Sequence, residues 1–287
     1  ELQFTPTEVQ FAEAAAGGTF IVTSSADPGD FVCDIAGTGD GCTLREAIDA
    51  ANLNPGPDVI EFAILGAGVQ TIAPLTPLPA VTDDLIINGY SQPGAVANSL
   101  GPVDGGLDGT LLIELSGQNS TGDGLVIDPT AVNVFIDGLV INRWSGAGVR
   151  INAGPTATII LGGNYIGTSA DGLSVPTPAQ GNGVLVTGAG PATYIAVGEF
   201  LPAQRNLISG HVDHGVVVST SNVEVLGNLI GTDVTGLAAL GNGRRGVFLS
   251  SNGAAIDIVI VDGQPETRNI IGGNGEDGIG LECAAPR

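Results

Sequence analysis

Histidine is the side chain best suited to proton transfer or metal binding near neutral pH, and this sequence contains only two. They lie close together, as His211 and His214, with Asp213 between them. Two imidazoles and a carboxylate at this spacing are a candidate metal site or general base. The three residues fall in a predicted corner loop, however, and there we expect solvated turn residues. The chemical site is kept as the alternative.

A second group of polar residues contains four aspartates near the first predicted helix. Their carboxylates, with nearby carbonyl oxygens, are candidate Ca²⁺ ligands. The sequence has neither a twelve-residue EF-hand loop nor a nonapeptide Gly-Gly-x-Gly-x-Asp repeat. We therefore expect no resident metal or cofactor, with Ca²⁺ as the alternative. The four residues are Asp27, Asp30, Asp34 and Asp40.

The three cysteines indicate whether the protein resides in an oxidising or a reducing compartment. Cys33 and Cys42 flank a loop rich in Gly and Asp, so a disulfide between them would close a short loop before the first helix. Such a bridge would indicate an oxidising compartment. Two free thiols are the alternative, and a metal site is disfavoured because no other Cys or His lies nearby. Cys283 is left to pair with another chain or with further sequence.

Charge and composition exclude several functions. The 287 residues include 30 acidic and 8 basic ones, a net charge of −22, and all eight basic residues are Arg. Such a chain repels phosphate backbones, so we expect no nucleic-acid partner. Schiff-base lysines and Walker-type phosphate sites are impossible without Lys. Since 43% of the residues are hydrophobic, a core can form; since no apolar run approaches about 18 residues, we expect no membrane insertion.

One segment has the features of an amphipathic helix. Thr43 and Glu46 have the spacing of a capping box, and an apolar stripe follows them along about residues 43–53. The sequence Asn-Pro-Gly-Pro at 54–57 ends it. A strand is expected before it, at residues 19–23. In a chain otherwise rich in strands, the helix is expected to cap an open sheet edge.

The decisive feature of the sequence is an internal repeat. From Asp58 onward, short apolar runs rich in Val and Ile alternate with Gly, Asn and Asp. Residues 164–173 match 228–237 at an offset of 64, and residues 205–210 match 268–273 at an offset of 63. Within these units asparagines recur at spacings of 22, 42, 22 and 41, which indicates a period of about 21. They are Asn142, Asn164, Asn206, Asn228 and Asn269.

A period of about 21 fits one turn of a three-sided parallel β-solenoid. Each turn buries its apolar face only against its neighbours, while Gly and Asn take the corners. The recurring Asn residues are expected to stack as a ladder of hydrogen-bonded amides. The predicted fold class is all-β, a β-solenoid of about ten coils with an N-terminal capping helix.

The segment Cys-Thr-Leu-Arg-Glu-Ala-Ile-Asp-Ala-Ala-Asn at 42–52 resembles the signature of the CSLREA domain, with Thr43 where Ser is usual. The segments at 54–62 and 88–94 also look like that family, and the resemblance covers nearly everything from residue 19 to residue 281. It implies a right-handed parallel β-helix and a secreted or cell-surface protein. The motif is not specific for an activity, and it carries no catalytic residues.

Parallel β-helices also host polysaccharide-degrading enzymes, whose motifs would be visible in the sequence. A polygalacturonase-like site needs Asn-Thr-Asp, Asp-Asp, Gly-His-Gly and Arg-Ile-Lys; only an Asp pair is present, and the last motif is impossible without Lys. A calcium-dependent lyase needs an Arg or Lys base beside carboxylates, and nothing in the sequence places Arg143, Arg150 or Arg205 beside acids. Trp144, the only Trp, is a candidate sugar platform or a packing residue. Asn119 begins the one glycosylation sequon.

The expected domains are an extended arm (1–18), a cap with the disulfide loop and helix (19–57), and the parallel β-helix (58–287). The arm carries two alternating apolar pairs, Leu2 with Phe4 and Val9 with Phe11. It is expected either to pack on its own domain or to add to the sheet edge of a second copy. The far end of the solenoid has no predicted cap, which motivates end-to-end assembly into fibres; a truncated chain is the alternative.

The leading functional hypothesis is a non-catalytic extracellular or cell-surface protein with a structural, adhesive or matrix role. Its expected partners are copies of itself, through the solenoid ends or the arm, and polysaccharide is a further candidate. The alternatives are a secreted polysaccharide lyase or glycoside hydrolase and a carbohydrate-binding module. The enzyme alternative predicts acids and an Arg converging on one face. The low charge fraction favours the structural role.

Overall fold

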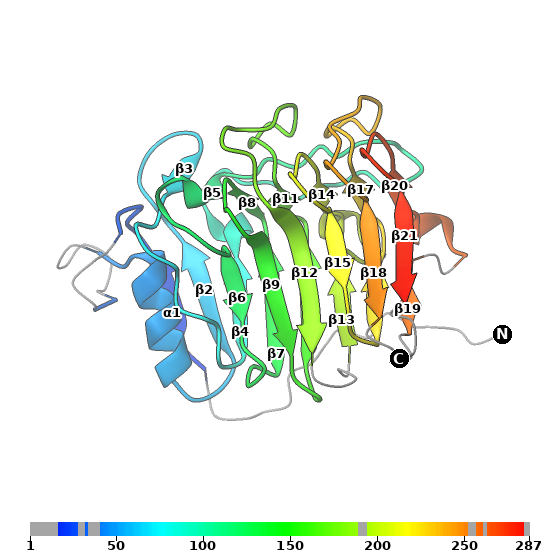
Figure 1. Ribbon diagram of the computed structural model, residues 1–287. Helices are drawn as coiled ribbons and strands as arrows, with labels where there is room; N and C mark the ends of the chain where they lie inside the picture. The colour runs from blue at the N-terminus through cyan, green and yellow to red at the C-terminus, as the bar shows by residue number, and fades with distance from the viewer. Residues whose placement is uncertain are drawn as a thin grey trace.

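The computed structural model describes residues 17–27, 32–33, 41–188, 194–251, 257–260 and 263–283. The described chain is all-β in character, with three parallel sheets and one α-helix (Figure 1). From β7 to β21, successive strands enter the three sheets in strict rotation, so each circuit adds one strand to every sheet. We call one such circuit a layer. Within the described residues, no helix is long and apolar enough to cross a bilayer.

Sheet A has eight strands in the order β1 (Thr19–Val22), β2 (Asp58–Phe62), β4 (Leu85–Asn88), β7 (Asn133–Asp137), β10 (Thr158–Gly162), β13 (Tyr194–Val197), β16 (Val223–Val225) and β19 (Ile258–Val259). Sheet B has seven: β3 (Gln70–Ile72), β5 (Ile113–Ser116), β8 (Leu139–Asn142), β11 (Tyr165–Ile166), β14 (Leu207–Ile208), β17 (Leu229–Ile230) and β20 (Ile270–Ile271). Sheet C has six: β6 (Leu125–Ile127), β9 (Ala147–Ala153), β12 (Asn182–Gly188), β15 (Val216–Val218), β18 (Val247–Ser251) and β21 (Ile279–Cys283).

These strand numbers show that the expectation of about ten coils is wrong for the described residues. The error lies in the period, because adjacent layers differ in loop length. Asn164 and Asn206 belong to neighbouring layers although they are 42 residues apart, and Asn206 and Asn228 are neighbours at 22. A spacing of 42 is therefore one long layer rather than two short ones.

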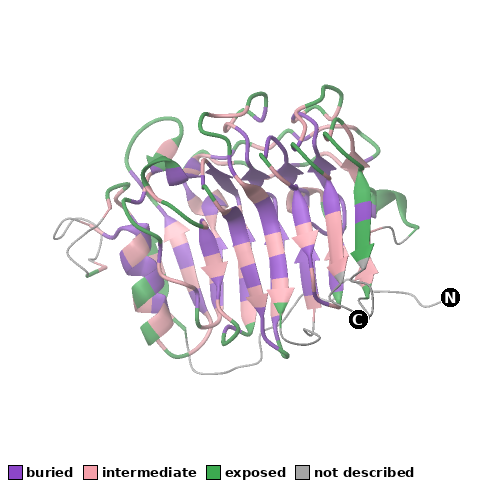
Figure 2. Cartoon of the chain, in the orientation of Figure 1, coloured by how far each residue is buried: buried purple, intermediate pink, exposed green. Residues whose placement is uncertain are grey.

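The core lies between the three sheets. Alternate strand residues are fully buried, as in β2, where Ile60 and Phe62 face the core and Glu61 lies between them at intermediate burial. Burial of such aliphatic side chains contributes roughly 1.5–3 kcal/mol each. One continuous apolar cluster runs from the helix through the last layers. Figure 2 shows this as purple bands across the strands.

The helix α1 (Leu44–Leu53) covers the end of the sheets at which β1 and β2 lie (Figure 1). The predicted capping box is present: the Thr43 hydroxyl accepts from the Glu46 backbone N–H, and the Glu46 carboxylate accepts from the Thr43 N–H at 2.8 Å. The stripe formed by Leu44, Ala47, Ile48 and Ala51 is buried. The helix therefore covers the core at this end, as its amphipathic pattern predicts.

A long connection from η1 (Gly89–Ser91) to β5 lies along sheet B and covers part of it. Arg205 holds this connection: its buried guanidinium donates to the carbonyls of Leu100, Gly105 and Gly106 at 2.8–3.1 Å. Desolvation lowers the pKa of Arg205 to about 10. The remaining short helices are η2 (Gly117–Asn119), η3 (Pro202–Gln204) and η4 (Pro265–Thr267).

Candidate functional site

The three sheets end together at the layer formed by β19, β20 and β21 (Figure 1). Among the described residues, each of these strands has a hydrogen-bonded neighbour on one side only. Ile279 and Leu281 are 46% and 63% exposed, whereas Val216 and Val218, at the same register positions two layers earlier in β15, are fully buried. Figure 2 shows β21 largely in green for this reason. We call this surface the open end.

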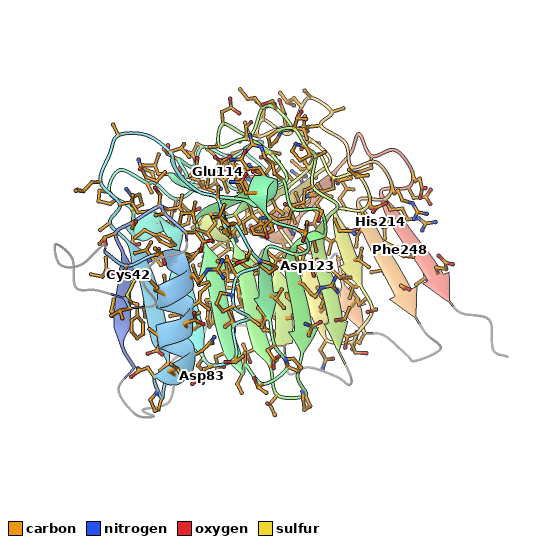
Figure 3. The ribbon with its side chains drawn as sticks, turned by 60° about the vertical axis from the view of Figure 1, so that its left-hand side comes forward. Cys42, Asp83, Glu114, Asp123, His214 and Phe248 are labelled. Atoms are coloured by element: carbon orange, nitrogen blue, oxygen red, sulfur yellow. A yellow bond between two sulfur atoms is a disulfide. The ribbon has the colours of Figure 1, made fainter. Side chains whose placement is uncertain are left out.

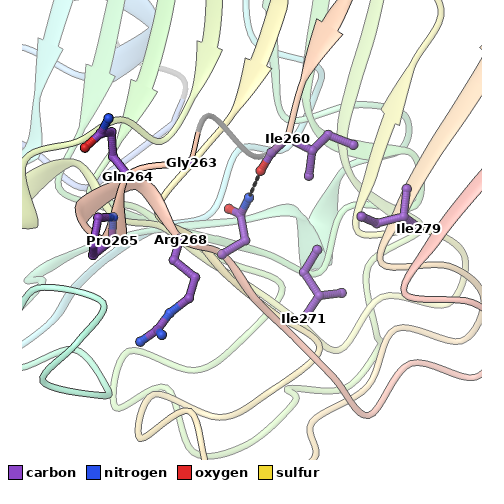
Figure 4. Close-up of a pocket in the computed structure, with 8 residues that line it drawn as sticks. Ile260, Gly263, Gln264, Pro265, Arg268, Ile271 and Ile279 are labelled. Carbon is purple, nitrogen blue, oxygen red and sulfur yellow. Dashed lines mark hydrogen bonds between the residues drawn. The ribbon is translucent and has the colours of Figure 1, made fainter.

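A cavity of about 500 Å³ lies at the open end (Figure 4). Ile260, Ile271 and Ile279 contribute apolar surface to it, and Arg268 and Asn269 contribute polar atoms. The Nδ2 atom of Asn269 donates to the carbonyl of Ile260 at 2.8 Å, the dashed line in Figure 4. An apolar cavity rimmed by polar groups is the usual form of a docking surface.

The predicted asparagine ladder is present over four layers. Asn164, Asn206 and Asn228 each donate their backbone N–H and Nδ2 to Oδ1 of the asparagine in the next layer, and the series ends at Asn269. The inclusion of Asn142 in this ladder is wrong. Asn142 is the last residue of β8, three positions beyond the ladder column, and it donates to Glu114 and to the carbonyl of Thr168.

A second ladder, which the sequence analysis did not predict, contains one of the histidines. The His211 backbone N–H donates to Oδ1 of Asn242, and the Asn242 N–H and Nδ2 donate to Oδ1 of Asn274. The Nδ1 atom of His211 lies 2.6 Å from the same Asn242 oxygen. His211 is only 3% exposed, and desolvation lowers its pKa to about 4. The expectation of a solvated turn is therefore wrong for His211.

The other two residues of the predicted cluster have different surroundings. His214 is also buried, with its ring stacked on Phe248 at 4.7 Å, and its Nδ1 accepts the Arg245 backbone N–H. Burial, and then the charges of Arg244 and Arg245, lower the pKa of His214. Asp213 has intermediate burial. Figure 3 shows His214 and Phe248 together near the open end. A combined metal site from the three residues is not formed, since within the described chain no three His, Cys, Asp or Glu side chains converge.

The predicted bridge between Cys33 and Cys42 is present in the structure. Cys42 is fully buried beside the N-cap of α1, so the bridge fastens the preceding segment to the helix start (Figure 3). The disulfide fits an extracellular protein. Among the candidate Ca²⁺ ligands, Asp27 forms a buried ion pair with Arg45 at 2.6 Å. Asp30, Asp34 and Asp40 lie outside the described residues, as does the arm with Leu2, Phe4, Val9 and Phe11.

Of the three arginines considered as candidate bases, Arg143 and Arg150 do lie beside acids, which the sequence did not predict. Arg143 pairs with Glu114 at 3.3 Å, and Arg150 pairs with Asp123. Glu114 also accepts from Thr71 and Asn142, so its oxygens are already occupied by donors. These pairs join different layers, and we assign them a structural role.

Glu199 and Glu224 meet at a single hydroxyl. The Tyr194 hydroxyl lies 3.2 Å from Oε1 of Glu199 and 3.0 Å from Oε2 of Glu224. Because a phenol has one hydrogen, only one carboxylate can receive it. Desolvation by burial raises the pKa of Glu199. Tyr194 and Glu224 also line a cavity of about 280 Å³ on the outer face of sheet A, with Asp257 at its rim.

The remaining candidates are placed as follows. Trp144 is fully buried at a corner and is a packing residue rather than a sugar platform. Asn119 ends η2 and is exposed, so the sequon is accessible. Cys283 is the last residue of β21.

No known protein family model matches this sequence, and no curated protein matches it either. The resemblance to the CSLREA domain therefore stays an expectation.

Proposed function

We propose that this protein is a non-catalytic extracellular structural component, a right-handed parallel β-helix capped at one end by α1 and associating through its open end. The observation that supports this role is the contrast between the two ends. Leu44, Ala47 and Ile48 of α1 cover the core at one end, while Ile279 and Leu281 are half exposed at the other. Exposed strand edges next to apolar surface promote strand addition.

Secretion or display at the cell surface agrees with the Cys33–Cys42 disulfide, because such bridges persist in oxidising compartments. The charge of −22 opposes lateral contact between molecules at low salt. A structural, adhesive or matrix role needs a stable surface and an association site but no catalytic group.

Edge-blocking variants test the role of the open end. Leu281→Lys places a charge on the exposed edge, and Leu237→Lys is the matched control, because Leu237 is 91% exposed in a loop. Both variants change the net charge equally. The measurement is the amount of chain that stays bound to the extracellular fraction in which it occurs. This amount is expected to fall at least tenfold for Leu281→Lys and to stay unchanged for Leu237→Lys. Equal retention of both variants would contradict the proposal.

Self-assembly end to end, predicted from the sequence, is a separate test. If the arm carries self-assembly, particle size and electron micrographs will show filaments of the full chain and none of a chain lacking residues 1–12. Monomers in both forms would contradict self-assembly through the arm.

A polysaccharide-degrading enzyme is the second candidate, favoured by the Glu199–Tyr194–Glu224 arrangement. Glycoside hydrolysis uses a pair of carboxyl groups, one of which has a raised pKa, as Glu199 has through burial. The test is release of reducing ends or unsaturated uronides from a polysaccharide panel. Activity that is lost in Glu224→Gln but kept in Glu61→Gln, a half-buried glutamate on the same sheet, would replace the structural proposal.

A further inference from the structure

We propose that the open end is the docking site for one uncapped β-layer of the same repeat type, carrying asparagine at two corners. This inference rests on the proposed function in one respect, that the open end is an association surface. The argument depends on the direction of the hydrogen bonds between layers.

The first ladder has a single direction. Each asparagine donates its backbone N–H toward the open end, to Oδ1 of the asparagine in the next layer: Asn206 to Asn228 at 3.3 Å, and Asn228 to Asn269 at 2.9 Å. Asn269 is the last member, and the described residues supply no acceptor for its backbone N–H. The ladder thus ends in a donor that lacks the amide oxygen every earlier member has.

The second ladder ends in the same way. The Asn242 N–H donates to Oδ1 of Asn274 at 3.3 Å, and Nδ2 of Asn242 donates to the same oxygen at 2.9 Å. Asn274 has no described acceptor for its own backbone N–H. The open end therefore presents two N–H donors at two corners of the layer.

A third column runs in the opposite direction. Here the later layer donates to a side chain of the earlier one: His214 N–H to Oδ1 of Asn182 and Arg245 N–H to Nδ1 of His214. The next member of this column at the open end is Asp277, whose side chain is 70% exposed. Arg245 has no side-chain acceptor, so the column is interrupted at its layer, and the Asp277 carboxylate lies 3.6 Å from the Arg245 guanidinium. The exposed carboxylate is the remaining acceptor of this column at the open end.

The apolar surface agrees with the polar pattern. Ile271 and Ile279 line the cavity of about 500 Å³, in the position where inward side chains of another layer would pack. In the preceding layer the corresponding residues, Ile230 and Val247, are fully buried by β20 and β21. The occupant must therefore carry aliphatic residues between its two asparagines.

A folded second copy does not meet these requirements. Its other end is covered by α1. The first ladder does not reach that end, because its first donor is Leu139 in β8, the third strand of sheet B, which donates its N–H to Asn164 and offers no amide oxygen. Two open ends facing one another would bring donors against donors at both corners. The fitting partner is a segment that folds as a layer while it docks.

One layer of this chain has the required features and serves as the probe. Residues 221–251 contain β16, Asn228, β17, Asn242 and β18. The strand pairings show that residue 220 occupies the same position within its layer as residue 283 does within the last layer. A second copy of residues 221–251 attached after Cys283 therefore continues the stack of layers in the same register. The matched control is the same extension with alanine in place of the two asparagines of the added copy.

The readout is amide hydrogen exchange at Asn269 and Asn274 in the extended full chain. The asparagine extension is expected to slow exchange of both amides at least 100-fold relative to the unextended chain, and the alanine extension less than tenfold. Equal protection by the two extensions would overturn the inference, because apolar burial alone would explain it. If the fusion fails to fold, a synthetic 221–251 peptide added to the full chain gives the same comparison.

Two further outcomes are decisive. Protection of both amides in the unextended chain that rises with protein concentration would show that a folded copy covers the end, and would overturn the inference. The binding measurement on Leu281→Lys tests the proposed function and not the ladder. The extension experiment measures the ladder whether or not the unextended chain associates, so the two failures are distinguishable.

Discussion

Oδ1 of Asn228 accepts two hydrogen bonds from Asn206, one from its backbone N–H at 3.3 Å and one from its Nδ2 at 2.9 Å. Both side chains are fully buried. The pair joins neighbouring layers at a corner where the chain turns from sheet A to sheet B, so the backbone donor there has no strand partner of its own. The asparagines supply the bonds that a regular sheet would otherwise supply.

Replacing a central asparagine should therefore be costly. Asn206→Ala leaves the buried Asn164 N–H without its acceptor, and it removes one of the two donors to the Leu161 carbonyl, which keeps the Gly198 N–H. We expect a loss of about 2–4 kcal/mol in the free energy of unfolding. Chemical denaturation measures it. Asn119→Ala, at an exposed position, is the control and should change stability by less than about 0.5 kcal/mol; equal losses would contradict the role of the ladder.

The second ladder depends on a column of glycines in sheet C. Pairing places Gly183, Gly215 and Gly246 at one register position in successive layers. A Cβ atom on these residues would lie 2.9, 2.8 and 2.9 Å from atoms of His211, Asn242 and Asn274 respectively. The small residue at each layer thus leaves room for the buried polar side chain behind it.

Gly215→Ala should destabilise the protein for steric reasons. The added methyl would also lie 2.6 Å from the carbonyl of Gly246, and backbone cannot move away cheaply. We expect a loss of about 1–3 kcal/mol in the free energy of unfolding. In Gly101→Ala the nearest atom would be the Asp104 carboxylate at 3.4 Å, so thermal unfolding should be nearly unchanged. A midpoint shift as large in the control as in Gly215→Ala would argue against the column.

Much of this architecture is visible in the sequence. Recurring asparagines and apolar runs of three to six residues predicted parallel layers, and Thr43 with Glu46 predicted the capped helix. These signals are local, because the role of each residue is set by its neighbours in the sequence of the same layer. The predicted number of layers was wrong because it depends on loop length. The spacing between Asn164 and Asn206 fits either one layer with long loops or two layers with short loops.

The burial of His211 could not be predicted by treating its loop alone. Its environment is set by Gly183 and Asn242, residues of the layers before and after. A signal does exist: each strand of sheet C from β6 onward has a glycine beside its first inward aliphatic residue, as at Gly183-Val184 and Gly215-Val216. The meeting of Tyr194 with Glu224 likewise depends on register between strands, which spacing does not determine.

Reduction of the disulfide should loosen the capped end. Cys33 and Cys42 are nine residues apart, and closing a loop of this size is worth about 2–3 kcal/mol in the unfolded chain. Cys42 adjoins the Thr43 cap, so the loss should be largest at α1. Thermal unfolding with and without reductant measures the stability, and amide exchange locates it. The Cys33→Ala/Cys42→Ala variant should match the reduced protein and be insensitive to reductant; a reductant effect on that variant would point to another cause.

His211 should make the protein less stable in acid. Its pKa is about 4 in the folded state against 6.5 ordinarily, because burial disfavours the charged ring. Between these values the unfolded chain binds the proton and the folded chain does not, so this contribution is complete above pH 6.5 and is lost as pH falls toward 4. The difference corresponds to about 3 kcal/mol. Denaturation of His211→Asn across this range should lack that dependence, and an unchanged profile would contradict it.

Asp137 should act in the opposite direction. Burial raises its pKa from 3.8 to about 7, and its Oδ1 has no hydrogen-bond donor among the described residues. Between these pH values the unfolded chain releases the proton and the folded chain retains it, so stability falls as pH rises, by about 4 kcal/mol in total.

The contributions of His211 and Asp137 to stability therefore offset one another in the native protein. Asp137→Asn should leave a profile that rises with pH from 4 to 6.5, whereas His211→Asn should leave one that falls. Stability curves from denaturation at each pH distinguish them, and parallel profiles for the two variants would contradict both assignments.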